Sequence, residues 1–202
     1  MIINDKYKFV FVHIQKTAGA SITDYLFKIP ETKQINHSHS MINTLNCDNY
    51  KDYFKFCFVR NPFDRLVSWY NMMINKDIHN DFSKYILENS NNFSEFLDLT
   101  NIINETNEYN DNLKTPYPKS ISFNQLDYII DNSGKIQCDF IGKFEEIESD
   151  FNKITKQLGF DIKIEHLNKI NHKPYREYYT LKDIKKLETL YERDLDYFKY
   201  YF

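Results

Sequence analysis

Two apolar runs, each followed by a polar loop and a helical pattern, limit what this chain can fold into. The first run, Tyr7–Ile14, is rich in aromatic and β-branched residues and leads into the loop Gln15–Ser21. The second run, Phe54–Val59, is followed after one residue by Asn61 and Pro62, which suit the N-cap and the first turn of a helix. Short continuous apolar runs are typical of buried parallel strands. The pattern therefore predicts an α/β fold with a central, mainly parallel sheet flanked by helices.

The rest of the chain continues this alternation. A strand is expected at 138–142, followed by a helix that Gly159 closes. Thr180 and Asp183 form a capping-box pattern at the start of a C-terminal helix. The stretch from about 75 to 118 is rich in Asn and acidic residues, with a helix expected at Phe93–Ile103. We therefore predict a single domain over residues 1–202, with a variable insertion of helices and loops at about 75–125.

Composition excludes several classes of function. The 202 residues include 26 Lys and Arg against 29 Asp and Glu, and the formal charge of −3 argues against a general nucleic-acid or membrane-surface binder. Cys47, Cys57 and Cys138 are too widely spaced for a disulfide framework or a CxxC metal knuckle. The sequence has neither a signal-peptide pattern nor an apolar stretch long enough to cross a bilayer. We therefore expect a cytoplasmic protein without a nucleic-acid partner, membrane insertion or a metal.

The loop after the first strand has the composition of a phosphate site. Ligands of open α/β sheets bind beyond the carboxyl ends of strands, where helix N-termini offer unpaired N–H groups. Small residues let the backbone approach such a ligand, Lys16 adds a positive charge, and two hydroxyl groups add donors. The candidate ligand-binding residues are Gln15, Lys16, Thr17, Ala18, Gly19, Ala20 and Ser21. The Walker A order GxxxxGK[ST] does not fit, because Lys16 and Thr17 precede the glycine. An ordinary lysine in a strand-to-helix turn is the alternative.

A second anion site is predicted at the end of the second strand. Arg60 stands at its carboxyl end, where a guanidinium can donate two parallel hydrogen bonds to a phosphate. Ser68 lies eight residues further on, within the next helix, and offers a hydroxyl group. Two such sites on neighbouring strands favour a ligand with two phosphate groups. The alternative is that Arg60 pairs with a carboxylate and Ser68 faces water.

These motifs resemble those of sulfotransferases that use 3′-phosphoadenosine-5′-phosphosulfate (PAPS). Residues 11–22, FVHIQKTAGASI, resemble the family's 5′-phosphosulfate loop FVHIPKTGGTS, and residues 56–70, FCFVRNPFDRLVSWY, resemble its 3′-phosphate motif VRNPxxRxxSxY. Residues 139–145, DFIGKFE, are similar to its DFIGRFE segment, and residues 175–180, YREYYT, to the pattern before its last helix. The resemblance is strongest to the carbohydrate-type branch with the heparan sulfate and uronosyl 2-O-sulfotransferases. It implies a P-loop-like three-layer fold.

The resemblance also implies an activity, which is transfer of a sulfuryl group from PAPS to a hydroxyl group of a glycan or other small acceptor, without a metal. Lys16 is expected to neutralise charge on the leaving 5′-phosphate, and Arg60 with Ser68 to bind the 3′-phosphate. Lys173 and Arg176 are expected to reach the phosphates of PAPS, with two solvated cations as the alternative.

A general base is expected because an alcohol is a poor nucleophile at neutral pH. The candidates are His37 and His39, which match the HxH element of the 2-O-sulfotransferases, and either of them can be the base. A zinc pair and two surface histidines are the alternatives. Gln125 resembles a family glutamine and is expected to position the acceptor.

The sequence departs from the family pattern within the first motif. Gln15 stands where proline is usual, Ala18 where the first glycine is, and Ala20 where threonine is. Ala18 loses backbone freedom that glycine would have, and Ala20 loses a possible phosphate donor. Two other functions are therefore kept as alternatives, a P-loop kinase that uses ATP and a catalytically inactive nucleotide-binding scaffold.

Overall fold

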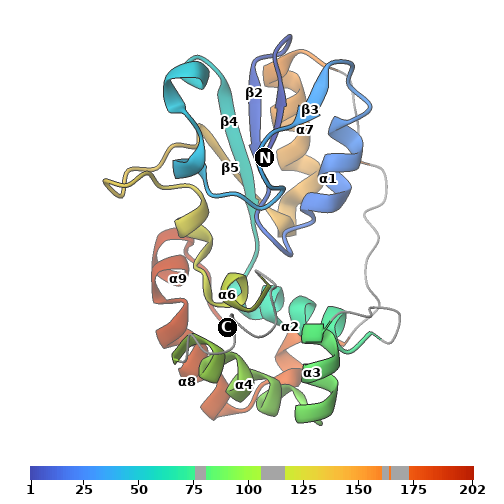
Figure 1. Ribbon diagram of the computed structural model, residues 1–202, viewed down its shortest axis with the longest axis vertical. Helices are drawn as coiled ribbons and strands as arrows, with labels where there is room; N and C mark the ends of the chain where they lie inside the picture. The colour runs from blue at the N-terminus through green and yellow to red at the C-terminus, as the bar shows by residue number, and fades with distance from the viewer. Residues whose placement is uncertain (76–80, 106–116, 161–163, 165–172) are drawn as a thin grey trace. The chain divides into compact units, whose positions relative to one another are not determined.

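The computed structural model describes residues 1–75, 81–105, 117–160, 164 and 173–202, and Figure 1 traces them as two compact units. The first unit comprises Met1–Arg60 and Gln125–Ile170, and the second comprises Asn61–Asn124 and Asn171–Phe202. Each unit is therefore assembled from two separate stretches of the chain. The single domain over residues 1–202 and the insertion at about 75–125 stay predictions.

A five-stranded sheet forms the centre of the first unit, in the order β3-β1-β2-β4-β5. The strands are β1 (Ile2–Asn4), β2 (Phe9–Val12), β3 (Thr32–Gln34), β4 (Phe54–Val59) and β5 (Phe140–Lys143). Strand β1 is antiparallel to both β2 and β3, whereas β2 pairs with β4, and β4 with β5, in parallel. All strands except β1 therefore run in one direction, which confirms the predicted α/β fold with a mainly parallel sheet. The register aligns Phe11 with Phe56, and Phe56 with Phe140.

One face of this sheet packs against two helices, α1 (Gly19–Leu26) and α7 (Ile147–Leu158). Side chains two residues apart on a strand share a face, so Phe9 and Phe11 of β2 lie beside Phe56 and Phe58 of β4. Ile22 and Leu26 of α1, and Phe151 and Ile154 of α7, complete this buried cluster. Helix α7 ends at Gly159, whose left-handed φ of 74° makes it the expected C-cap. Helices on both faces, as a three-layer fold requires, stay a prediction.

Short 3₁₀ helices connect the elements of the first unit. They are η1 (Ile42–Thr44), η2 (Cys47–Tyr50), η3 (Gln125–Tyr128) and η4 (Phe144–Glu146). The expected first strand, Tyr7–Ile14, is shortened to β2 at both ends. Tyr7 and Lys8 belong to the turn between β1 and β2, in which Lys8 is left-handed, and the backbone leaves the sheet again before the left-handed turn at Lys16. The expected second strand is confirmed from Phe54 to Val59.

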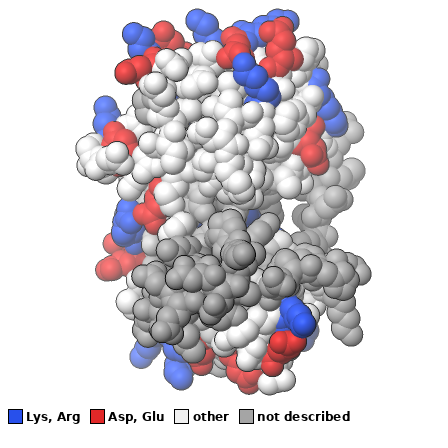
Figure 2. All heavy atoms as spheres, viewed as in Figure 1, with Lys and Arg blue, Asp and Glu red and all other residues white. Residues whose placement is uncertain are grey.

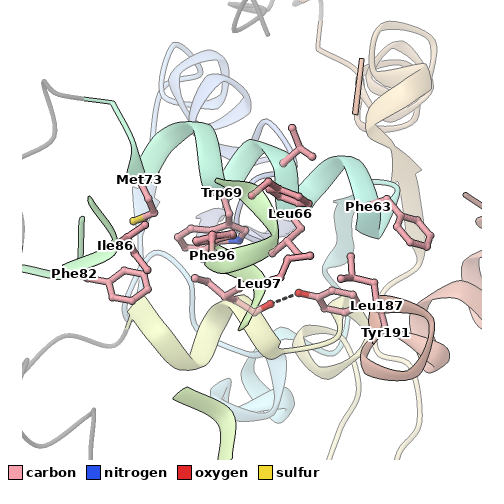
Figure 3. Close-up of a cluster of buried hydrophobic side chains, with 13 residues drawn as sticks. Phe63, Leu66, Trp69, Met73, Phe82, Ile86, Phe96, Leu97, Leu187 and Tyr191 are labelled. Atoms are coloured by element: carbon pink, nitrogen blue, oxygen red, sulfur yellow. Dashed lines mark hydrogen bonds between the residues drawn. The ribbon is translucent and has the colours of Figure 1, made fainter. Parts of the chain in front are cut away.

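The second unit is helical. It contains α2 (Pro62–Met73), α3 (Asp81–Asn89), α4 (Phe93–Glu105), α6 (Tyr117–Ser122), η5 (Tyr175–Tyr178), α8 (Leu181–Leu190) and α9 (Glu192–Phe198). Asn61 caps α2 by accepting from the main-chain N–H of Phe63 at 3.0 Å, and Thr180 with Asp183 forms the predicted capping box of α8. Figure 3 shows Leu66 and Trp69 of α2 among side chains from α3, α4 and α8, in an apolar core of their own.

Charged side chains on the described surface are mixed in sign. On the face that Figure 2 shows, Lys and Arg side chains lie interspersed with Asp and Glu side chains. The one-sign surface that general nucleic-acid binding requires is not seen on the described residues of that face. Among the described helices, none combines the length and apolar character that a membrane span requires.

Candidate functional site

The loop between β2 and α1 has an unusual backbone. Lys16 and Ala18 both adopt left-handed conformations, with φ of 66° and 63°, although neither is glycine. Thr17, which lies between them, donates its hydroxyl hydrogen to the main-chain oxygen of Ile14 at 2.9 Å and so closes the turn. Left-handed residues in a turn direct successive N–H groups toward one side, which suits an anion. The phosphate contact expected of the Thr17 hydroxyl stays a prediction.

Lys16 and Arg60 meet in the first unit. The guanidinium of Arg60 donates from Nη1 to the main-chain oxygen of Lys16 at 3.3 Å. It also lies 4.0 Å from the ring centroid of Phe144, a cation–π contact for which sequence reasoning had no signal. Burial, and then the nearby charge of Arg60, lowers the pKa of Lys16 from 10.5 to about 8. The two predicted anion motifs therefore bring two cationic side chains to one place, where a bound anion would offset their repulsion.

Gln125 holds the end of β4 in place. Its side chain is fully buried, and its amide makes two hydrogen bonds of 2.9 Å with the backbone of Arg60. The Oε1 atom accepts from Arg60 N–H, and the Nε2 group donates to the Arg60 oxygen. Gln125 thus fixes the residue that carries the guanidinium, a contact that the sequence did not predict. Its expected role in positioning the acceptor stays a prediction.

Three histidines gather beside the loop. His39 is half-buried, and its Nδ1 atom lies 3.3 Å from the main-chain oxygen of His13. The rings of His13 and His39 meet edge to face at 4.4 Å, and those of His37 and His39 lie 5.9 Å apart. Burial lowers the pKa of His39, and burial lowers that of His13 to about 3, so both rings are neutral at pH 7. His37 is exposed, and its Nδ1 atom accepts from the main-chain N–H of His39 at 3.3 Å.

The hydrogen bonds assign opposite tautomers to His37 and His39. A carbonyl oxygen only accepts, so His39 carries its proton on Nδ1 and has a lone pair on Nε2. A backbone N–H only donates, so neutral His37 has its lone pair on Nδ1 and a proton on Nε2. At their Nε2 atoms, His39 is therefore an acceptor and His37 a donor.

The other predicted site residues differ in their burial and in their contacts. Gln15 is buried and accepts from the Tyr128 hydroxyl at 3.4 Å, whereas Ala20 is exposed. Ser68, Lys173 and Arg176 belong to the second unit, where Ser68 is buried on α2 and the other two are exposed. The Arg176 guanidinium lies 5.1 Å from the ring centroid of Phe202. The phosphate contacts expected of these residues stay predictions. Within the described part of the chain, His, Cys, Asp and Glu side chains form no group of three suited to a metal ion.

A cationic turn between a parallel strand and a helix, joined by an arginine from the neighbouring strand, is an arrangement that suits anion binding in α/β proteins. The chain belongs to the sulfotransferase family, whose sequence model matches residues 1–201. Comparisons with curated proteins and with solved structures gave no match. The protein is therefore a transferase of a family that moves sulfuryl groups, and the resemblance of its motifs to sulfotransferases is confirmed.

Proposed function

We propose that the protein transfers a sulfuryl group from PAPS to a hydroxyl group of a carbohydrate or other small acceptor. Membership of the sulfotransferase family supports sulfuryl transfer, and sulfotransferases generally use PAPS as the donor. The observation that carries the proposal is the 3.3 Å contact between the Arg60 guanidinium and the Lys16 oxygen, because it joins the two anion motifs. A donor with phosphate groups at its 3′ and 5′ positions requires two neighbouring cationic groups of this kind.

The loop residues Gln15–Ser21 would bind the 5′-phosphosulfate end of this donor. Main-chain N–H groups at the left-handed turn and the start of α1 suit the non-bridging oxygens, and Lys16 suits the charge that develops on the leaving phosphate. Arg60 would bind the 3′-phosphate, with Ser68, Lys173 and Arg176 as further donors. The lowered pKa of Lys16 supports this assignment, because an anion beside it would favour its charged form.

His39 is the base in this proposal, and His37 is a hydrogen-bond donor. The acceptor oxygen forms a bond to sulfur while the bond from sulfur to the 5′-phosphate oxygen breaks. The hydroxyl proton passes to Nε2 of His39, whose lone pair is set by the Nδ1–H bond to the His13 oxygen. The electron pair of the broken bond leaves with adenosine 3′,5′-bisphosphate, next to Lys16. No metal takes part in this scheme.

Binding experiments test the donor site first. Isothermal titration calorimetry should show that adenosine 3′,5′-bisphosphate binds without magnesium, and more tightly than ATP with magnesium. Lys16→Ala should weaken this binding, whereas Lys135→Ala, which removes an exposed charge of the same unit, should leave it unchanged. Tighter binding of ATP with magnesium would favour a kinase instead.

Turnover experiments test the transfer itself. With ³⁵S-labelled PAPS and a panel of oligosaccharides, the wild-type protein should label an acceptor. A variant with both His37→Ala and His39→Ala should bind the bisphosphate normally and transfer nothing. A wild-type protein that binds the bisphosphate but labels no acceptor would favour the inactive scaffold, for which Ala18 at a left-handed position is the motivating observation.

A further inference from the structure

His13 contacts both Gly19, at the start of α1, and His39, the base in the proposed function. It follows β2 directly, it is 9% exposed, and its ring stacks on that of Phe11 at 5.8 Å with an interplanar angle of 17°. The ring contacts the start of α1 as well as His39. His13 falls within the expected first strand, Tyr7–Ile14, and no pattern in the sequence predicted its contacts with His39.

The first contact is with Gly19. A methyl group added at Gly19 would lie 1.9 Å from Cδ2 and 2.1 Å from Nε2 of His13. Any residue larger than glycine at this position therefore has to displace the His13 ring. The absence of a side chain at position 19 lets the imidazole pack directly on the backbone at the start of α1.

The second contact is with His39. The edge-to-face contact of the two rings at 4.4 Å restricts the plane of the His39 imidazole. The main-chain oxygen of His13 accepts the Nδ1 proton of His39 at 3.3 Å, which determines its tautomer. One residue thus supplies both the carbonyl that sets the protonation pattern of His39 and the ring against which His39 rests.

We infer that His13 is a positioning residue that couples the start of α1 to His39 and holds His39 in the tautomer with its lone pair on Nε2. The consequence for catalysis rests on the proposed function, in which His39 is the base. His13 does not exchange a proton in this role, since it acts through the position of its ring and its carbonyl.

The charges around His13 agree with this role. Burial is the main cause that lowers the pKa of His13 to about 3. The positive charges of protonated His39 and of the N-terminal amino group lower it further. His13 therefore stays neutral at any pH at which a histidine base is useful. A neutral ring does not repel the imidazolium that His39 becomes when it accepts a proton.

The experiment is ¹⁵N NMR of the histidine side chains in the full-length, ligand-free protein. In the wild type, the His39 signals should report a protonated Nδ1 and an unprotonated Nε2. His13→Ala and Gly19→Ala should each move these signals toward a mixture of tautomers and raise the pKa of His39 toward 6.5. Both variants keep the main-chain carbonyl of residue 13 but remove or displace the ring that holds His39 against it, so water can compete for Nδ1. His13→Phe, which keeps an aromatic ring on Gly19 and His39, should largely retain the wild-type signals.

Gly142→Ala is the matched control. Its added methyl group would meet the Phe58 ring at 2.5 Å, a similar collision in the same unit but with a ring that does not contact His39. This control should lower stability and leave the His39 signals unchanged. If the folded Gly19→Ala and His13→Ala variants both keep the wild-type His39 signals, the inference is overturned. If only one of the two variants folds, wild-type signals in that variant overturn it.

Kinetics separate this inference from the proposed function. If the protein transfers sulfuryl groups, His13→Ala should lower kcat by about 10- to 100-fold with little change in the KM for PAPS, because a misplaced base slows the proton transfer alone. His13→Phe should recover most of kcat. A wild-type protein without transfer activity but with the predicted NMR shifts would contradict the proposed function and support the positioning role. An unchanged kcat in an active His13→Ala variant would overturn that role.

Discussion

The two units bury polar side chains for different purposes, and their arginines show the difference most clearly. In the second unit, Arg65 is 1% exposed and donates to the main-chain oxygens of Phe123 at 3.1 Å and Ser120 at 3.3 Å, at the end of α6. In the first unit, Arg60 is 7% exposed, lies on Phe144 and donates to the turn that carries Lys16. Arg65 satisfies carbonyl groups that a helix end leaves without partners, whereas Arg60 adds charge where charge is already concentrated.

The titratable groups show the same contrast. In the first unit, burial lowers the pKa values of three basic side chains, His13, Lys16 and His39. In the second unit, burial tends to raise the pKa of Asp183, but hydrogen bonds from Ser94 and Thr180 lower it, and the carboxylate caps α8. Perturbed bases that cluster beside a helix start fit the proposed donor site, whereas a satisfied carboxylate at a helix cap fits a contribution to stability.

The largest expected effect is on stability, from Arg65→Ala. Arg65→Ala removes two charged hydrogen bonds to main-chain oxygens and the packing of a buried side chain, so the free energy of unfolding should fall by roughly 3–5 kcal/mol. Chemical denaturation measures this change. The exposed Lys182 of the same unit is the control, since Lys182→Ala should change stability by less than about 0.5 kcal/mol. Equal effects of the two substitutions would contradict the structural role of Arg65.

Arg60→Ala, in contrast to Arg65→Ala, should weaken ligand binding more than it lowers stability. Binding of adenosine 3′,5′-bisphosphate should weaken by about 2–4 kcal/mol, because a buried, charge-assisted contact to phosphate is lost. The free energy of unfolding should fall by only about 1–2 kcal/mol, for loss of the contact with Phe144 and of the hydrogen bond to the Lys16 oxygen. Calorimetry and denaturation of the same variant give both numbers. Unchanged affinity would remove Arg60 from the site and end the contrast with Arg65.

Gln125→Ala separates two roles of one side chain. Its two hydrogen bonds to the Arg60 backbone predict a loss of about 1–3 kcal/mol in stability and weaker bisphosphate binding, because Arg60 is no longer held in place. If Gln125 instead positions the acceptor, the KM for the acceptor should rise while the bisphosphate affinity stays the same. Calorimetry together with acceptor kinetics distinguishes these results.

Several secondary-structure elements could be predicted from the sequence, whereas most of the side-chain contacts at the candidate site could not. Strand β4, the Asn61 cap and the capping box were predicted, because continuous apolar runs and cap residues act locally. Strands β1 and β3 were missed, since each has three residues and forms only by pairing within the sheet. The approach of Lys16 and Arg60 follows from parallel strands ending at one edge, whereas the contacts of His13 and Phe144 depend on packing that no local pattern encodes.

Binding should depend on pH through Lys16. Its pKa of about 8 means that the free amine is charged below pH 8 and neutral above it, while a bound anion favours the charged form. Bisphosphate affinity should therefore fall as pH rises above 8, by at most tenfold per pH unit, or about 1.4 kcal/mol. Titrations between pH 7 and 9.5 measure this. Lys16→Arg keeps its charge and should flatten the profile, and a flat wild-type profile would contradict the assignment.

The smallest expected effect is a change in stability caused by the backbone conformation of Ala18. Whether stability rises or falls shows if the loop is strained. Ala18 adopts φ of 63°, where a side chain costs about 1–2 kcal/mol that glycine avoids, so Ala18→Gly should raise stability despite the greater freedom of an unfolded glycine. The net gain should be about 0.5–1 kcal/mol. Ala20→Gly, two residues on and inside α1, should instead lower stability by about 0.5–1 kcal/mol.

Thermal and chemical denaturation of these two variants measure both changes. Opposite signs would mean that the loop holds its strained shape through the contacts around it, as expected where the first unit builds a ligand site. If Ala18→Gly lowered stability as much as Ala20→Gly, the left-handed turn would carry no strain, and Ala18 would no longer distinguish this loop from an ordinary helix start.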